Sequence, residues 1–182
     1  MDETEVLFNG RWLRLCRRGR WEYAERTSPG GAVIVIALTP EDNVIFVEQW
    51  REAIRKRAIE MPAGLIGDEP GKESEHLLDA ARRELLEETG YACGRIDYYM
   101  TGPSSSGMST ETIAFVRAWD LQRRHAGGGV AGEDIQVHEV PRTVAAQWLC
   151  RKLAEGYSID PKVFAGLYFL EHGPALFRGE AG

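Results

Sequence analysis

The sequence predicts an α/β fold in which a mixed β-sheet is sandwiched between helices, with a small N-terminal β-hairpin region. Strand-like and helix-like segments are interspersed without a regular strand–helix–strand repeat, which favours a mixed sheet. Runs of β-branched apolar residues indicate buried strands, and clusters of glycine and proline separate them. The 182 residues suffice for one full domain with an appendage. We therefore expect a hairpin region at residues 1–30 and a main domain at residues 31–182.

The first half of the chain is expected to be mostly extended. Residues 5–27 partly alternate between apolar and polar, which predicts a hairpin with its turn at residues 17–19. The breaker cluster at residues 28–31 marks the boundary. The run GAVIVIALT, at residues 31–39, predicts a buried strand, and VIFVEQW, at residues 44–50, is expected to return as its hairpin partner.

The second half supplies the helices. Ser74 is expected to cap a helix that runs to Thr89, and Gly90 suits the position just after its end. The segments YYMTG, TIAFVRAW and IQVHEV are expected to be further strands. Two more helices are expected at about residues 144–155 and residues 161–172.

Composition narrows the possible functions. With 22 basic and 28 acidic residues the net charge is −6, which argues against a nucleic-acid partner and requires local positive charge at any phosphate site. The cysteines Cys16, Cys93 and Cys150 lie far apart and are expected to be small buried hydrophobes, which fits a cytoplasmic protein. The N-terminus has no secretory signal pattern, and the longest apolar run, residues 32–38, is too short to span a membrane.

The segment AARRELLEETGY carries the clearest chemical signal. At 100° per residue, Glu84, Glu87 and Glu88 share one arc of a helix together with small apolar residues. Like charges at these spacings repel each other, and a divalent cation bound by their oxygens removes the repulsion. A glutamate-rich face turned toward solvent is the competing interpretation.

The surrounding residues resemble the Nudix box. Residues 75–91 match its pattern E-x7-R-E-U-x-E-E-x-G-U, in which U is an apolar or aromatic residue. In the family, a glycine is separated by five residues from the first glutamate. That position is Glu69 here, so Gly64 is the expected equivalent and a short insertion follows it. The segments VIVIALT, VEQWR, EMPAGLI and GEDIQVHEVP resemble the ADP-ribose pyrophosphatase branch, which extends the resemblance over most of the chain.

The resemblance implies a Nudix fold, a role for Mg²⁺, which Mn²⁺ can replace, and functions for single residues. Arg83 would hold the box carboxylates in place, and Arg51 would contact a diphosphate, although an ordinary surface arginine is the alternative. Glu133 would act as general base, for which the neighbouring Asp134 is the alternative. The metal ligands would be the backbone carbonyl of Ala63 and the side chains of Glu84, Glu87, Glu88 and Glu133.

The resemblance further implies hydrolysis of the pyrophosphate bond of a nucleoside-diphosphate sugar, with ADP-ribose yielding AMP and ribose 5-phosphate. Trp21 and Tyr23 are candidates for stacking on the base, with burial in the core as the alternative. Glu111 can accept hydrogen bonds from sugar hydroxyls. The family's SPGFSDE loop reads SSGMSTE here, and the proline that would fix its backbone is Ser106. GDP-mannose or another sugar nucleotide is therefore the alternative substrate.

Two other classes of function and an assembly state complete the expectations. A non-catalytic Nudix-fold ligand sensor is disfavoured because all three box glutamates are present, and a decapping-type enzyme is disfavoured by the acidic charge. No membrane partner is expected. We expect a homodimer in which the N-terminal hairpin packs on its partner, because Trp12, Trp21 and Tyr23 exceed what two strands can bury. The resemblance points the same way.

Overall fold

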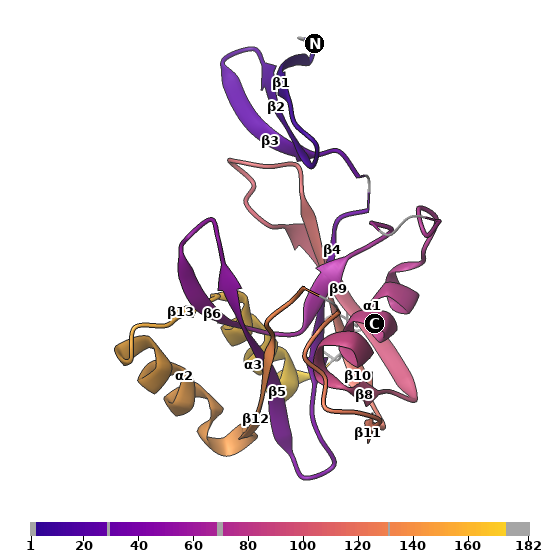
Figure 1. The fold of residues 1–182 in the computed structure, drawn as a ribbon, viewed down its shortest axis with the longest axis vertical. Helices are drawn as coiled ribbons and strands as arrows, with labels where there is room; N and C mark the ends of the chain where they lie inside the picture. Colours follow the sequence, from indigo (N-terminus) through magenta and orange to yellow (C-terminus); the bar gives the residue numbers. More distant parts are fainter. Residues whose placement is uncertain (1–2, 29, 69–70, 131, 174–182) are drawn as a thin grey trace, which may run out of the picture.

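A computed structural model describes residues 3–28, 30–68, 71–130 and 132–173. Figure 1 shows the N-terminal strands at one end of the molecule and the other elements gathered below them. The elements are β1 (Glu5–Asn9), β2 (Leu13–Arg18), β3 (Trp21–Arg26), β4 (Ala32–Ala37), β5 (Asn43–Arg51), β6 (Lys56–Glu60), β7 (Ala63–Leu65), α1 (Leu77–Thr89), β8 (Tyr91–Ala92), β9 (Arg95–Pro103), β10 (Thr112–Trp119), β11 (Gln122–Arg123), β12 (Gln136–Pro141), a 3₁₀ turn (Arg142–Val144), α2 (Ala145–Ala154), β13 (Ser158–Ile159) and α3 (Lys162–His172).

The N-terminal region is a three-stranded antiparallel sheet in the order β1-β2-β3. The predicted hairpin is confirmed for β2 and β3, which are joined through Gly19 at a φ of 58°. The prediction omitted β1, which pairs with β2 and aligns Glu5 with Arg17. A two-stranded ribbon is only marginally stable in water, and the third strand covers the otherwise free edge of β2.

Two four-stranded sheets form the body of the molecule, in the orders β7-β4-β10-β9 and β12-β5-β6-β13. Each sheet is mixed. β10 runs parallel to β4 in the first sheet, β13 runs parallel to β6 in the second, and the remaining neighbours are antiparallel. This arrangement confirms the predicted mixed-sheet α/β class.

The prediction that β5 is the hairpin partner of β4 is wrong. An isolated bridge joins Leu38 to Val44, and beyond it β5 enters the second sheet and pairs with β6 and β12. β4 and the first half of β5, residues 44–47, are apolar on both faces and almost completely buried. Such runs need a covering layer on each side, and two sheets packed face to face provide it. The apolar pattern alone does not show which strands pair.

Alternate residues of β4 point into two different cores, as the two-residue period of a strand requires. Ile34 and Ile36 join a core that contains residues of β5, α2 and α3. Val33 and Val35 join a second core that contains residues of α1 and β10. The helices accordingly lie on opposite sides, with α1 on one side of the sheets and α2 and α3 on the other (Figure 1). The sheet is thus sandwiched between helices, as expected.

Helix α1 begins later than predicted. Its N-cap position is His76 rather than Ser74, because residues 72–75 form a turn in which the Glu75 N–H donates to the Lys72 carbonyl at 2.8 Å. Its end is as predicted, since Gly90 has a φ of 76° and donates its N–H to the Leu86 carbonyl. The last two helices each begin one residue later than expected.

The cysteines differ in burial. Cys16 is buried as predicted, Cys93 is half-buried, and the expected burial is wrong for Cys150, which lies on the exposed side of α2. All three are free thiols. Within the described ranges, the helices are too short or too polar to cross a membrane.

Candidate active site

Arg83 is the hub of the charged cluster on α1. Its Nε and Nη2 donate to the Glu75 carboxylate at 3.0 Å each, and its Nη1 donates to Glu84 at 2.8 Å and to Glu87 at 3.3 Å. Nη2 also donates to the carbonyl of Leu65 on β7. These bonds raise the pKa of Arg83 and lower the pKa of Glu75. One guanidinium therefore ties the loop before α1, strand β7 and the glutamates of the helix together.

Gly64 on β7 lies directly against Glu84. A Cβ at this position would overlap the carboxyl group of Glu84, so any larger residue would push the glutamate away. This close approach supports the expectation that Gly64 takes the place of the box glycine. Glu69, at the usual position in the sequence, lies outside the described residues, as does part of the insertion that we expected there.

Two of the three box glutamates have little exposed surface, and the Glu84 side chain is 13% exposed. Glu88 is 5% exposed and accepts the Ala63 N–H at 3.0 Å. Burial raises the pKa of Glu88 well above its usual range, and it raises the pKa of Glu84 to about 7 despite the neighbouring Arg83. Buried carboxylates without matching positive charge are costly, and a divalent cation would offset that cost. An all-oxygen donor set of this kind fits a hard cation such as Mg²⁺.

The glutamates do not yet point at one common position. Across the part of the chain that the structure describes, no three Asp, Glu, His or Cys side chains form a metal-binding cluster. Oxygens of Glu84 and Glu87 are occupied by Arg83, and Glu88 is held by Ala63. A cation would therefore have to draw these carboxylates away from their present donors. The ligation by the Ala63 carbonyl stays a prediction, since the bond seen here uses its N–H.

A glycine-rich loop, at residues 127–129, packs on the C-terminal end of α1. Two of its N–H groups donate to the carbonyls of Glu88 and Glu87, at 2.8 and 3.0 Å. Carbonyls in the last turn of a helix have no partner within the helix, and here the loop supplies the donors. The loop is thereby attached to the same helical turn that carries the box glutamates.

Glu133 and Asp134 leave this loop in different directions. The Glu133 carboxylate lies against Gly129, accepts the Val130 N–H at 2.9 Å, and contributes to the raised pKa of Glu88. The Asp134 side chain is 74% exposed and accepts from Arg57 at 2.8 Å. Of the two adjacent acids, Glu133 is therefore the one beside the box glutamates.

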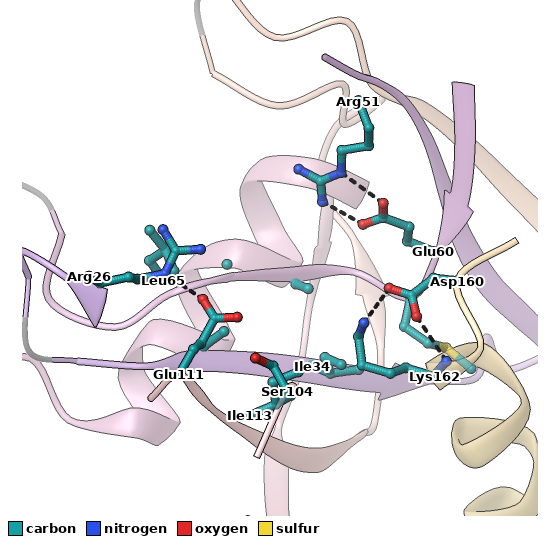
Figure 2. Close-up of a pocket in the computed structure, with 14 residues that line it drawn as sticks. Arg26, Ile34, Arg51, Glu60, Leu65, Ser104, Glu111, Ile113, Asp160 and Lys162 are labelled. Carbon is teal, nitrogen blue, oxygen red and sulfur yellow. Dashed lines mark hydrogen bonds and ion pairs between the residues drawn. The ribbon is translucent and has the colours of Figure 1, made fainter. Parts of the chain in front are cut away.

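A cavity of about 520 Å³ opens next to Ala63 and Gly64 (Figure 2). Arg51 lines this cavity and donates two hydrogen bonds to Glu60, with Nε–Oε1 and Nη2–Oε2 distances of 2.7 and 2.5 Å. Glu60 is 8% exposed, so this ion pair is anchored in the wall of the cavity. The Arg51 side chain is itself 44% exposed, so its contact with a diphosphate stays a prediction.

Two more ion pairs line the same cavity (Figure 2). Arg26 at the end of β3 pairs with Glu111, which precedes β10. Lys162 at the start of α3 pairs with Asp160, with an Nζ–Oδ2 distance of 2.6 Å. The sequence reasoning missed Arg26, Asp160 and Lys162, which match no short motif and reach the cavity through tertiary packing.

Trp21 and Tyr23 lie elsewhere. They line a separate cavity of about 440 Å³, together with Ser106 and Gly107 of the loop before β10. Trp21 is 61% exposed, so it is not part of the core, whereas Tyr23 is half-buried. A single chain therefore does not bring these rings to the cavity of Arg51, and the expected stacking on a base stays a prediction.

The sequence also matches known proteins. The family model described as the NUDIX domain matches residues 28–165. The chain belongs to the Nudix family. A crystal structure of an ADP compounds hydrolase superposes on this Nudix hydrolase with a TM-score of 0.68 at 19% identity, over 94% of each chain, and so shares its fold.

Three relatives of this Nudix hydrolase are named for three different functions. It is 31% identical to the methanol dehydrogenase activator of Bacillus methanolicus, over 96% of this chain and 93% of that protein. It is 36% identical to the GDP-mannose pyrophosphatase of Escherichia coli (strain K12), over 65% of this chain and 63% of that protein. It is 32% identical to the ADP-ribose pyrophosphatase of Bacillus subtilis (strain 168), over 64% of each.

Proposed function

We propose that this Nudix hydrolase cleaves the pyrophosphate bond of a nucleoside-diphosphate sugar with the help of Mg²⁺, and that ADP-ribose is its main substrate. The observation that carries the proposal is the position of the half-buried Glu84 and the buried Glu88 beside a cavity of about 520 Å³. This volume lies within the usual range for small-molecule sites. Relatives named for ADP-ribose and GDP-mannose hydrolysis support this substrate class.

The residues of the site divide the work of the reaction. A bound divalent cation supplies charge neutralisation and a more acidic water. Glu84, Glu87 and Glu88 would hold that cation, and Arg51 would contact the diphosphate. Glu133 would accept the proton of the water whose oxygen attacks one phosphorus, while the bridging P–O bond breaks and the second phosphate leaves. Asp134 is the weaker candidate for the base, because Arg57 holds its carboxylate away from α1.

The sugar end of the cavity is the reason to retain GDP-mannose as the alternative. Glu111, proposed to bind sugar hydroxyls, already pairs with Arg26, so this end presents a cation beside a carboxylate. Ser106 replaces the proline that the family's loop usually carries. Ser106 lines the separate cavity of Trp21 and Tyr23, so it is the pair of Arg26 and Glu111 that would bear directly on whether ribose or mannose fits.

A substrate panel with product identification tests the proposal. The panel contains ADP-ribose, GDP-mannose, UDP-glucose, diadenosine polyphosphates, NADH and 8-oxo-dGTP. We expect the highest kcat/KM for ADP-ribose, with AMP and ribose 5-phosphate as products. A kcat/KM at least about tenfold higher for another sugar nucleotide would overturn the ADP-ribose assignment alone, since such a ratio corresponds to about 1.4 kcal/mol. Turnover of nucleoside triphosphates only would overturn the substrate class, and binding without turnover would indicate a ligand sensor.

We also propose that residues 1–30 serve as the dimerisation region of a homodimer. The N-terminal region exposes several large aromatic side chains, among them Phe8 on β1, Trp12 between β1 and β2, and Trp21 on β3. An exposed apolar patch of this kind usually marks an interaction surface. One edge of this sheet is already used within the chain, because Ala24 of β3 bonds to Met108 and Thr110 in the loop before β10. The aromatic side chains are left for a partner.

A further inference from the structure

Glu48 is a buried charge that the proposed reaction does not use. It is 2% exposed and lies on β5, between β6 and β12. Its carboxylate accepts from the Nε of Arg57 and contacts the Nε2 of His138 at 2.9 Å. Both partners are diagonal neighbours of Glu48 on the adjacent strands, which places the three side chains on one face of the sheet. Burying a charged group costs free energy, so the burial of Glu48 calls for an explanation.

The second arm of Arg57 reaches the loop that carries Glu133. Its Nη1 donates to the Asp134 carboxylate at 2.8 Å, and its Nη2 donates to the Asp134 carbonyl at 3.4 Å. Because the buried Glu48 holds the Nε, the guanidinium has a fixed orientation toward the loop. A planar guanidinium that binds two carboxylates in this way acts as a rigid connector between them.

The loop is therefore attached at two places, on either side of Glu133. Residues 127–129 bond to the last turn of α1, and Asp134 is held by Arg57. Glu133 lies between these attachments, and its carboxylate accepts the Val130 N–H and lies against Gly129, whose own N–H donates to the Glu87 carbonyl of α1. Holding Asp134 thus also sets the direction of Glu133.

We propose that Arg57, oriented by Glu48, is a positioning residue that holds Asp134 and so fixes Glu133 beside Glu88. The inference rests on the proposed role of Glu133 as general base. A general base must lie within hydrogen-bond reach of the water that it deprotonates, and a displacement of about 1 Å can lower the rate roughly a hundredfold. The pair of Arg57 and Asp134 would therefore act on the rate of the reaction more than on substrate binding.

A double-mutant cycle tests this inference. We expect Arg57→Met to lower kcat roughly 10- to 100-fold with little change in KM. In the Glu133→Gln background the same substitution should have almost no further effect on kcat, because its influence passes through Glu133. Equal losses in both backgrounds would overturn the proposal. Asp134→Asn removes only the exposed end of the pair and should behave in the same way, which guards against a folding defect of the Arg57 variant.

A matched control and a readout without substrate separate this proposal from the proposed function. Arg142→Met breaks a comparable exposed pair, with Asp42, at the other end of β12 and should leave kcat unchanged. In hydrogen exchange followed by NMR, we expect the amides of residues 128–129 and of Glu133 to exchange faster in Arg57→Met and not in Arg142→Met. Unchanged exchange would overturn the positioning role, whether or not sugar nucleotides are hydrolysed.

Discussion

At the scale of single residues, the burial that prepares the box glutamates for a cation should lower the stability of the metal-free protein. Burial raises the pKa of Glu84 from its ordinary 4.5 to about 7 and raises that of Glu88 well above its usual range. A carboxyl group whose pKa is raised by folding stabilises the protein at low pH, and this contribution is lost as pH rises through the folded-state pKa. The metal-free protein should therefore lose stability from about pH 4.5 to pH 7 through Glu84 alone.

The first prediction is that Glu88→Gln abolishes turnover and yet raises the Tm of the metal-free protein at pH 8. The amide keeps an oxygen for the Ala63 N–H and removes the buried charge. Each kcal/mol gained corresponds to roughly 2–4 °C in a chain of this size. Calorimetry in EDTA measures the gain, and Glu171→Gln on the exposed side of α3 serves as control. Full hydrolysis in excess EDTA would contradict the metal mechanism.

The second prediction concerns Lys162. Its ammonium lines the cavity, and Asp160 keeps a bond from the Lys162 backbone N–H at 2.9 Å if the ammonium moves to a phosphate. Lys162→Met should therefore raise KM several-fold with little change in kcat. Lys152→Met breaks a similar pair, with Glu155, on α2 and provides the control in steady-state kinetics. The same KM for both variants would argue against a phosphate contact.

At the scale of elements, the site depends on how closely β7 approaches α1. The third prediction is that Gly64→Ala weakens Mg²⁺ binding and lowers kcat while the protein stays folded, because the new methyl group would displace the Glu84 carboxylate. Gly102→Ala on β9 is the control, since a Cβ there meets its nearest atom at an ordinary 3.6 Å. Titration calorimetry with Mg²⁺ measures the difference, and equal affinity in both variants would count against this account.

The fourth prediction belongs to the loop after residues 127–129. Glu133→Gln should lower kcat about 10²–10⁴-fold, the usual loss when a general base is removed, with a much smaller change in KM. Asp134→Asn should lose less, because the pair of Asp134 and Arg57 is proposed only to position Glu133. If single-turnover kinetics show the larger loss for Asp134→Asn, the base has been assigned one residue too early.

The elements themselves could be predicted to different degrees. The end of α1 at Gly90 and most strands follow from local chemistry, so their prediction succeeded. The start of α1 was missed because residues 72–75 form a turn, closed by the Glu75 N–H and the Lys72 carbonyl, and Glu75 pairs with Arg83 eight residues further on. The partner of β5 was missed because its apolar first half, residues 44–47, is buried on both faces and carries no information about its neighbours.

At the scale of the whole molecule, the N-terminal sheet is an appendage that reaches the candidate site. It bonds to the loop before β10 through Ala24, and Arg26 lines the main cavity. The fifth prediction is a dimeric mass in light scattering at micromolar concentration, reduced to a monomeric mass by Trp12→Glu at an exposed position between β1 and β2. A monomeric mass for the unsubstituted protein would rule out the proposed homodimer.

The residues of the candidate site that belong to a sequence motif could be predicted, and the residues outside a motif could not. The segment around α1 identified the glutamates and Arg83, because their spacing on one helix fixes their neighbours. Asp160 and Lys162 were beyond reach, since they arrive at the cavity through the parallel pairing of β13 with β6. No local pattern in the sequence encodes a pairing between strands about a hundred residues apart.

The three ion pairs around the cavity should make substrate binding depend on the concentration of free magnesium. Each cation of the described lining faces a carboxylate, namely Arg26 with Glu111, Arg51 with Glu60, and Lys162 with Asp160. A diphosphate entering alone would therefore find little net attraction, and Mg²⁺ would provide most of it. Cation and substrate should then bind cooperatively, and thermodynamic linkage requires each to tighten the other by the same factor. The half-saturating concentration of substrate would thus fall as the free magnesium concentration rises.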